Sequence, residues 1–152
     1  QDETGGFLTY IPLAYHTENN ELGESLHRVG TATTGYEDLK NIAIGRLYFD
    51  NVPHVKTHWP MVTPFMSQVA LSWGCDDVEG TVVYERVYHE AGARTQMHMQ
   101  YLDLVRLIRG AGKRPVERDS LYATVRESFD DLPPPPDPAH LPGRELPVVH
   151  AA

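Results

Sequence analysis

The segment from His54 to Trp59 places three side chains that can carry positive charge on one face. Because the side chains of a strand point to alternate faces, His54, Lys56 and His58 share one face, and Val55 and Trp59 lie on the other. Three such groups are costly to bury unless they meet water, an anion or a substrate. An ammonium group and imidazole N–H groups suit a carboxylate. We therefore predict that this face lines a substrate cavity; the alternative is an exposed sheet edge.

Polar residues also follow the first predicted strand. Segment 6–13 is apolar and rich in strand-forming residues, and His16 and Asn19 come soon after it. In a parallel barrel, ligands bind where the strands end at their carboxyl face. We therefore predict that His16 and Asn19 contact a substrate, against the simpler alternative that a lone loop histidine is a surface residue.

Glu85 and His89 follow a third predicted strand, at 80–83. They are four residues apart, so they share one face if the segment is helical, and the alternative is a solvated helical turn. The histidines and Glu85 are types that ligate metals, but no local pair of them has the spacing of a zinc site, so no metal is predicted. The sequence also lacks the GxGxxG, GxxxxGK and GxSxG motifs.

Strand-like and helix-like segments alternate before the last 20 residues or so. Thr34 and Glu37 form a capping box at the start of one helix, and Thr63 caps a second helix that has Pro64 in its first turn and Gly74 at its end. The predicted order is strand 6–13, helix 34–51, strand 54–59, helix 63–74, strand 80–83, helix 95–109, an extended segment 114–118 and a terminal helix capped by Asp119.

This alternation predicts βαβ units and a parallel sheet, hence an α/β fold. Three units cannot close a barrel, because an eight-stranded barrel typically takes about 250 residues. We therefore predict that residues 1–131 are the C-terminal part of a TIM-like (β/α) barrel. Seven of the 12 prolines lie between Pro133 and Pro147, so residues 132–152 are predicted to form an extended Pro-rich tail.

Composition limits the class of protein. The chain has 152 residues, 41% of them hydrophobic, and a formal net charge of −8, so nucleic acid is not an expected partner. No apolar run approaches the roughly 20 residues of a membrane span. The single cysteine, Cys75, cannot form an internal disulfide and is consistent with a reducing cytoplasm. The chain begins at Gln1, and we expect it to be cut from a longer protein.

An ordered set of short strings resembles the radical-SAM aminofutalosine synthases of the futalosine route to menaquinone. The strings are GGF at 5–7, IPLAYH at 11–16, RL at 46–47, DNVPHVK at 50–56, QVAL at 68–71, DDVEGTVV at 76–83, LIR at 107–109 and PVERD at 115–119. The run VYHEAG at 87–92 is more similar to the synthases than to the related dehypoxanthine futalosine cyclases. Thr17 departs from the proline expected after His16.

The resemblance implies a radical-SAM barrel and its chemistry. In that family an iron–sulfur cluster cleaves S-adenosylmethionine, and the 5′-deoxyadenosyl radical adds to the enolpyruvyl double bond of 3-[(1-carboxyvinyl)oxy]benzoate to give aminodeoxyfutalosine. The CxxxCxxC motif that holds the cluster is absent from this sequence. The resemblance therefore implies that an N-terminal barrel half, fused or separate, is the partner that holds the cluster, and that this chain alone is inactive.

On the substrate side, the resemblance and the inward face together assign binding to seven residues: His16, Asn19, His54, Lys56, His58, Glu85 and Arg118. No proton-transfer role is assigned to any of them. Two alternatives stay open. The chain could belong to the cyclase, or it could be a non-catalytic remnant or binding module that lacks the cluster half.

Overall fold

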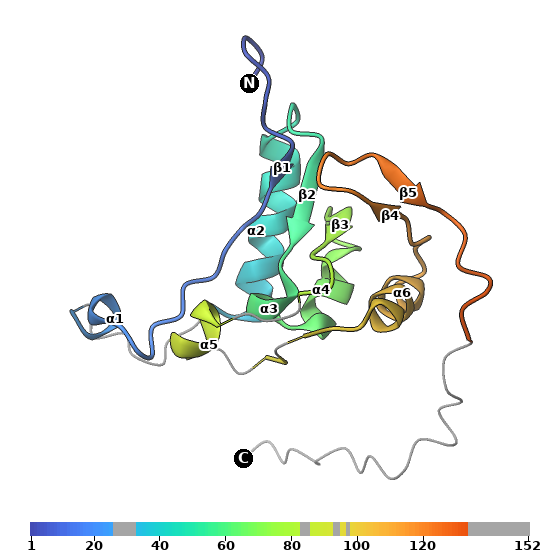
Figure 1. Cartoon of the computed structure of the whole chain (residues 1–152). Coiled ribbons are helices and arrows are strands. Elements are labelled where there is room, and N and C mark those ends of the chain that lie inside the picture. The colour runs from blue at the N-terminus through green and yellow to red at the C-terminus, as the bar shows by residue number, and fades with distance from the viewer. Residues whose placement is uncertain (26–32, 83–85, 93–94, 97, 134–152) are drawn as a thin grey trace.

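The computed structural model describes residues 1–25, 33–82, 86–92, 95–96 and 98–133. Its elements alternate between short strands and helices along the chain (Figure 1). In chain order they are β1 (Thr9–Tyr10), α1 (Glu21–Ser25), α2 (Gly35–Tyr48), β2 (His54–Thr57), α3 (Trp59–Val62), α4 (Pro64–Ala70), β3 (Asp77–Val78), α5 (Val87–Glu90), α6 (Tyr101–Gly110), β4 (Glu117–Arg118) and β5 (Thr124–Arg126).

Three of the strands form a parallel sheet in the order β1-β2-β3. Thr9 of β1 pairs with His54, and Lys56 pairs with Asp77 of β3. The predicted parallel α/β arrangement is confirmed for these strands, although β1 is limited to two residues of the segment 6–13. The described residues show this small sheet and not a barrel.

The third strand lies earlier in the sequence than predicted. β3 is Asp77–Val78. Two further backbone hydrogen bonds extend its pairing with β2: Asp76 N donates to Val55 O at 3.1 Å, and Glu79 N donates to Thr57 O at 3.0 Å. The prediction of a strand at 80–83 is wrong for 80–82, and residue 83 lies outside the described residues. Strand propensity favoured the β-branched run, whereas pairing with β2 selected the acidic segment before it.

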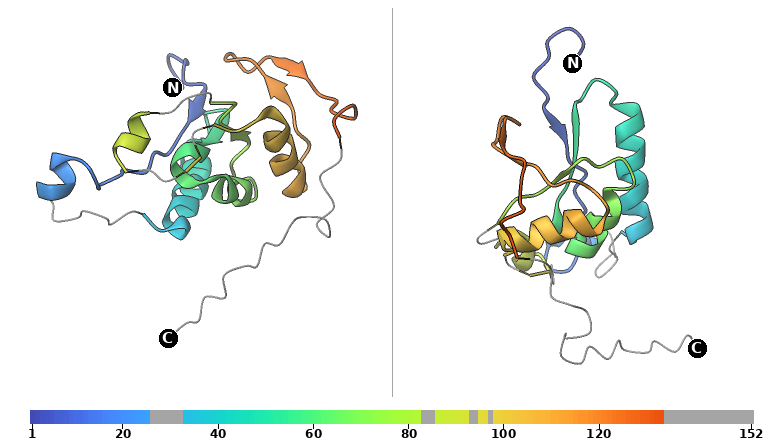
Figure 2. Two further views of the ribbon diagram at one scale, coloured as in Figure 1. Left: turned by 60° about the horizontal axis from the view of Figure 1, so that its bottom comes forward. Right: turned by 90° about the vertical axis from the view of Figure 1, so that its right-hand side faces the viewer.

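The sheet has an apolar face and a polar face. Tyr10 and Val55 point toward α2, where Val55 is fully buried beside Leu39 and Ile42. Thr9 and Lys56 line the opposite side, over which the β4–β5 hairpin lies. Figure 2 shows α2 and this hairpin on opposite sides of the sheet. The alternation predicted for 54–57 is confirmed by burial that alternates along β2.

Local capping signals define α2 and α4 as predicted. Thr34 Oγ1 accepts from Glu37 N at 3.3 Å, and Glu37 Oε2 accepts from Thr34 N at 2.7 Å, which completes the capping box. Thr63 caps α4 through Met66 N at 3.3 Å. α4 ends at Ala70, before Gly74.

Trp59 does not continue the β2 strand. It begins the short helix α3, is fully buried, and donates from Nε1 to Gly80 O at 3.1 Å. Its ring packs against Met99 and Leu104 in a second apolar cluster. The strand prediction for 54–59 is therefore correct for His54–Thr57 and wrong for its last two residues.

The C-terminal part differs most from the sequence prediction. α6 begins at Tyr101 rather than near residue 95, and it buries Leu104 and Val105. The terminal helix after Asp119 is absent, because β4 and β5 form an antiparallel hairpin there. Asp119 Oδ1 accepts from the backbone N–H groups of Leu121 and Ala123, both at 2.9 Å, so this residue closes a turn instead of capping a helix.

The predicted Pro-rich tail, 132–152, lies outside the described residues from 134 onward. Within the described ranges, none of the helices combines the length and the apolar character that crossing a bilayer requires.

Candidate functional site

Each basic side chain on the polar face of β2 is paired with a carboxylate of the neighbouring strand segment. Lys56 Nζ lies 2.9 Å from Glu79 Oε2, and His58 Nδ1 lies 3.2 Å from the same oxygen. His54 Nδ1 lies 2.7 Å from Asp76 Oδ2. The protein itself therefore supplies a carboxylate partner for each of these three residues, where a substrate carboxylate was predicted.

Glu79 is ionised at neutral pH. The hydrogen bond from His58 lowers the pKa of Glu79 to about 2, with Lys56 adding to the effect and burial opposing it. The negative charge thus stays on a side chain that is only 25% exposed and is flanked by Lys56 and His58.

The carboxyl end of the sheet gathers two histidines with unused nitrogens. The Nε2 atoms of His16 and His58 are buried and have no hydrogen-bond partner within the described chain. The ring of Tyr88 in α5 lies 6.2 Å from the His16 ring and 5.4 Å from the His58 ring. Two residues from separate loops are thus brought together against one aromatic ring.

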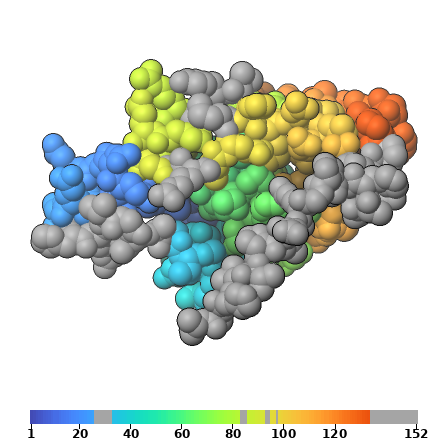
Figure 3. Space-filling model, turned by 90° about the horizontal axis from the view of Figure 1, so that it is seen from below, coloured from blue at the N-terminus to red at the C-terminus, as the bar shows by residue number. Residues whose placement is uncertain are grey.

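Figure 3 shows the molecule from this end, where α5 lies beside the N-terminal segment that carries His16. The loop after β1 is held to α5 by Asn19, whose Nδ2 donates to Glu90 O at 2.9 Å. Asn19 thus ties the loop after β1 to α5. Thr17 Oγ1 and Glu18 Oε2 are also buried without partners in the described residues. Unpaired buried polar atoms of this kind are rare in folded proteins and call for a further partner, such as water, an ion, a ligand or more chain.

The predicted site residue Arg118 pairs with Asp77, which lies opposite Lys56 in the sheet. Its Nε donates to Asp77 Oδ1 at 3.0 Å, and Tyr122 Oη donates to Asp77 Oδ2 at 2.8 Å. The Tyr122 ring stacks on the ring of His54 at 3.8 Å, so Tyr122 links His54, at the amino end of β2, to Asp77. Burial is the main cause that raises the pKa of Tyr122 to about 12, which keeps its hydroxyl protonated.

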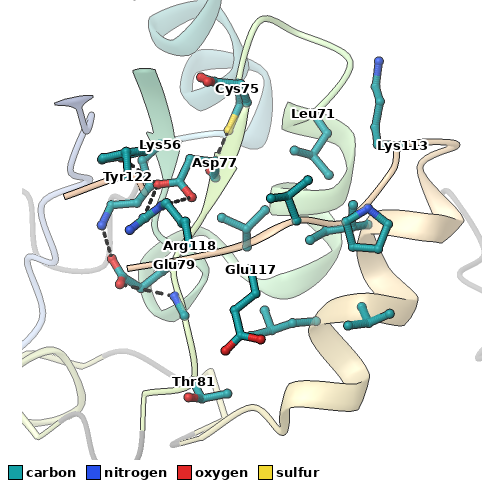
Figure 4. A pocket seen from close by; sticks show the side chains of 18 of the residues that line it. Lys56, Leu71, Cys75, Asp77, Glu79, Thr81, Lys113, Glu117, Arg118 and Tyr122 are labelled. Carbon is teal, nitrogen blue, oxygen red and sulfur yellow. Dashed lines mark hydrogen bonds and ion pairs between the residues drawn. The ribbon is translucent and has the colours of Figure 1, made fainter. Parts of the chain in front are cut away.

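A pocket of about 840 Å³ lies beside β3 and between the sheet, α6 and the hairpin (Figure 4). Its polar part is formed by Lys56, Asp77, Glu79 and Arg118. Figure 4 shows that these side chains are turned toward one another in ion pairs, with Tyr122 next to them. The rest of the lining is largely apolar and includes Leu71 and Leu104.

The structure brings His16 and His58 together around Tyr88, with Lys56 linked to His58 through Glu79. Arg118 lines the same pocket as Lys56 and Glu79 and pairs with Asp77, whereas His54 pairs with Asp76. Glu85 lies outside the described residues. Sequence reasoning missed Asp76, Asp77 and Glu79. The signal was present in the string DDVE, because a strand placed there sets Asp77 opposite Lys56.

The described residues do not fit an iron–sulfur cluster. Cys75 is the only cysteine of the sequence, it is buried, and its Sγ donates to Asp77 O at 3.0 Å. Burial is the main cause that raises the pKa of Cys75 to about 11, so the group is a thiol and not the thiolate that binds iron. No cluster of three or more His, Cys, Asp or Glu side chains able to hold a metal occurs in the described part.

Comparison with known proteins gives one family match and several named relatives. The family model described as "CofH/MqnC C-terminal region" matches residues 4–130. The chain is 48% identical over 126 residues to aminodeoxyfutalosine synthase of Thermus thermophilus, covering 83% of this chain and 34% of that protein. It is 43% identical over 145 residues to aminodeoxyfutalosine synthase of Streptomyces coelicolor, covering 91% and 36%.

A third relative has another name. The chain is 35% identical over 150 residues to cyclic dehypoxanthine futalosine synthase of Streptomyces coelicolor, covering 99% of this chain and 34% of that protein. The chain thus spans about a third of the length of the curated relatives it matches. The match over residues 4–130 shows that this chain belongs to the CofH/MqnC C-terminal region family.

Proposed function

We propose that the chain is the C-terminal portion of an aminodeoxyfutalosine synthase, a radical-SAM enzyme that acts on 3-[(1-carboxyvinyl)oxy]benzoate in menaquinone biosynthesis. The observation that carries this proposal is its identity of 48% and 43% to two proteins of that name. Identity to the cyclic dehypoxanthine futalosine synthase is lower, at 35%.

The cluster and S-adenosylmethionine belong, in this proposal, to an N-terminal portion of the complete protein. The matched family model describes a C-terminal region, and the chain spans about a third of its curated relatives. The sheet also supports continuation, because β1 and β3 each have a strand neighbour on one side only within the described residues. The buried Cys75 thiol fits a cytoplasmic enzyme.

The chain's own contribution is to bind and orient the substrate and to exclude water at the carboxyl end of the sheet. His16 and His58 offer unpartnered nitrogens there, and Lys56 is held in place by Glu79. Ligands of parallel α/β folds bind at this end of the strands, which supports the assignment.

A cyclase is the second candidate, since its relative covers 99% of this chain. The deciding experiment is an anaerobic assay of the complete protein with S-adenosylmethionine and a reductant. We expect aminodeoxyfutalosine from 3-[(1-carboxyvinyl)oxy]benzoate, detected by mass spectrometry, and no conversion of dehypoxanthine futalosine. The reverse result would assign the cyclase, and no turnover of either compound would favour a non-catalytic module.

A further inference from the structure

The side chain of Glu79 links two basic side chains at the carboxyl end of β2. Its Oε2 lies 2.9 Å from Lys56 Nζ and 3.2 Å from His58 Nδ1. The backbone fixes Glu79 in this position, because its N–H donates to Thr57 O at 3.0 Å. The side chains of Lys56, His58 and Glu79 are 13%, 14% and 25% exposed, so salt screens their charges only weakly. We call these three residues the Glu79 cluster.

The ionised carboxylate of Glu79 determines when the second nitrogen of His58 can donate. The pKa of Glu79 is lowered to about 2, mainly by the hydrogen bond from His58, so at neutral pH its carboxylate only accepts hydrogen bonds. His58 Nδ1 therefore carries a proton in the Glu79 cluster. A neutral imidazole has a single N–H, so Nε2 donates only when the ring holds a second proton and is an imidazolium.

This second nitrogen lacks a partner. His58 Nε2 is buried and unpaired among the residues that the structure describes, and so is His16 Nε2. The titratable groups next to the His58 ring are Lys56 of β2, Glu79 after β3 and Tyr88 of α5, whose ring meets it edge to face at 5.4 Å. The Tyr88 ring also lies 6.2 Å from the His16 ring. A ligand group that contacts His58 Nε2 would therefore lie beside Tyr88.

The loop after β1 adds one more carboxylate to this end of the sheet. Glu18 Oε2 is buried and has no partner in the described part of the chain. Its side chain lies against Gly92 at the end of α5, where an added Cβ atom would come within 2.6 Å of Glu18 Cβ. Glu18 is therefore the other acidic group that could hold a proton when a ligand binds.

The charge of the Glu79 cluster decides which ligand group suits His58 Nε2. Lys56 and Glu79 cancel, so the Glu79 cluster is neutral with a neutral His58 ring and carries one positive charge with an imidazolium. The proposed substrate offers two carboxylates and no hydrogen-bond donor. A neutral ring would turn the lone pair of Nε2 toward a carboxylate oxygen, which is repulsive. An imidazolium would instead donate a charge-assisted hydrogen bond.

We propose that His58 binds one carboxylate of the substrate as an imidazolium, so that substrate binding takes up a proton at His58 Nε2. Glu79 acts as a positioning residue that keeps the first proton on Nδ1. The inference rests on the proposed function and deepens it, because it names the group that recognises a carboxylate and makes this recognition depend on pH.

Proton uptake is measured by isothermal titration calorimetry of the complete protein. The probe is 3-(1-carboxyethoxy)benzoate, a saturated analogue of the substrate that offers no double bond to a radical. Binding heats in buffers of different ionisation enthalpy give the number of protons taken up. We expect uptake to rise toward about one proton per ligand, and affinity to fall, between about pH 6 and pH 8.5. The absence of uptake across this range would overturn the proposal.

Two single variants locate the proton. His58→Asn keeps an N–H group for Glu79 but has no atom at the position of Nε2, so proton uptake should disappear and Kd should rise about tenfold or more at about pH 6.5. Glu18→Gln is the matched control and should keep the uptake of the unmodified protein. Uptake that persists in His58→Asn, or is lost in Glu18→Gln, would refute the role of His58.

The double variant Lys56→Met/Glu79→Gln tests the role of Glu79 without stranding a charge. Glutamine can donate to His58 Nδ1 from its amide, so the neutral ring can place its proton on Nε2 and bind a carboxylate directly. We expect the analogue to bind with much reduced proton uptake. Unchanged uptake would show that Glu79 does not determine the protonation of His58, and would overturn the proposal.

Two further analogues identify the carboxylate that His58 contacts. In each of them a carboxamide replaces one of the two carboxylates. A carboxamide N–H can donate to the neutral Nε2 and needs no added proton, so one analogue should bind without uptake and the other should keep it. Uptake with both analogues would contradict a contact between His58 and a carboxylate.

These measurements separate the inference from the proposed function. If the analogue binds with the expected uptake but the complete protein makes no aminodeoxyfutalosine, the proposed function fails and the role of His58 stands. If aminodeoxyfutalosine forms and no proton is taken up on binding, the inference alone fails.

Discussion

The two ends of β2 carry the same kind of residue on the same face of the sheet, yet they differ in how completely these residues are paired. At the amino end, His54 bonds to Asp76 at 2.7 Å and stacks on Tyr122. At the carboxyl end, His58 bonds to Glu79 through Nδ1, but its buried Nε2 has no partner within the described chain. A closed network and an open one thus lie within five residues of sequence.

Residue type and the alternation of side chains along a strand therefore do not by themselves identify a ligand-binding side chain. The amino end is covered by the β4–β5 hairpin, where Tyr122 stacks on His54. In parallel barrels, polar groups at the amino end of strands serve stability, and ligands bind at the carboxyl end. We therefore expect substitutions at the two ends to affect different properties.

The largest effect on stability should come from Asp77→Ala in β3, beneath the hairpin. The change removes the acceptor of Arg118 and of the Tyr122 hydroxyl, and leaves a partly buried guanidinium without its partner. We expect a loss of about 3 kcal/mol in the free energy of unfolding. Urea denaturation of the complete protein measures this loss, with the exposed Asp50→Ala as control. Equal losses of unfolding free energy in Asp77→Ala and Asp50→Ala would show that the contacts of Asp77 with Arg118 and Tyr122 do not stabilise the fold.

Lys56→Met should reduce catalysis by about ten- to a hundredfold in kcat/KM, because Glu79 loses its ammonium partner and no longer holds His58 in place. Some stability is lost as well, because Glu79 is left without its ammonium partner. The sequence alone did not reveal this partner of Lys56. Steady-state kinetics of the complete enzyme measure the effect. Lys40→Met, on the exposed side of α2, is the matched control and should behave like the unmodified enzyme. Full activity of Lys56→Met would contradict the assignment.

A smaller effect is expected in acid. The pKa of Glu79 is lowered from 4.5 to about 2, so its ionised form contributes stability that is fully present above about pH 4.5 and is lost as the pH falls toward 2. Solvent reduces this contribution, because a quarter of the side chain is exposed. Thermal unfolding of Glu79→Gln and of the unmodified protein should differ most above pH 4.5 and converge toward pH 2. A difference in thermal stability that stays constant between pH 4.5 and pH 2 would show that ionisation of Glu79 does not stabilise the fold.

The smallest effect should come from Arg114→Met near the hairpin. Arg114 lies 3.1 Å from Glu127, but these side chains are 70% and 58% exposed. Exposed ion pairs contribute little, so we expect a change in unfolding free energy of about 0.5 kcal/mol or less. A loss as large as that of Asp77→Ala, measured by the same urea titration, would mean that the hairpin depends on its surface charges and not on the contact with Asp77.

Local chemistry explains which parts of the fold the sequence predicts well. The capping box of Thr34 and Glu37 and the Thr63 cap before Pro64 involve atoms three residues apart, and both helices start where predicted. The alternation in β2 also predicts its two faces correctly, because Val55 must reach the core beneath α2.

Long-range pairing explains the errors. The strand beside β2 is chosen by hydrogen bonds of Asp76 and Glu79 to the β2 backbone, whereas strand propensity favoured the β-branched run that follows. The segment after Asp119 turns back at Tyr122, whose φ of 65° is unusual for a residue other than glycine, and forms a hairpin. The candidate site was incomplete for the same reason, since the partner of Lys56 and His58 is Glu79, the residue that follows β3.

Hydrogen–deuterium exchange of the complete protein, with and without 3-[(1-carboxyvinyl)oxy]benzoate, tests most directly which end of the sheet binds the ligand. We expect the substrate to slow exchange in peptides covering 11–20 and 86–92 at the carboxyl end of the sheet. Exchange in the hairpin peptide 114–126 should not change. Protection confined to 114–126 would place the ligand under the hairpin beside Arg118, and it would contradict binding at the carboxyl end of the sheet.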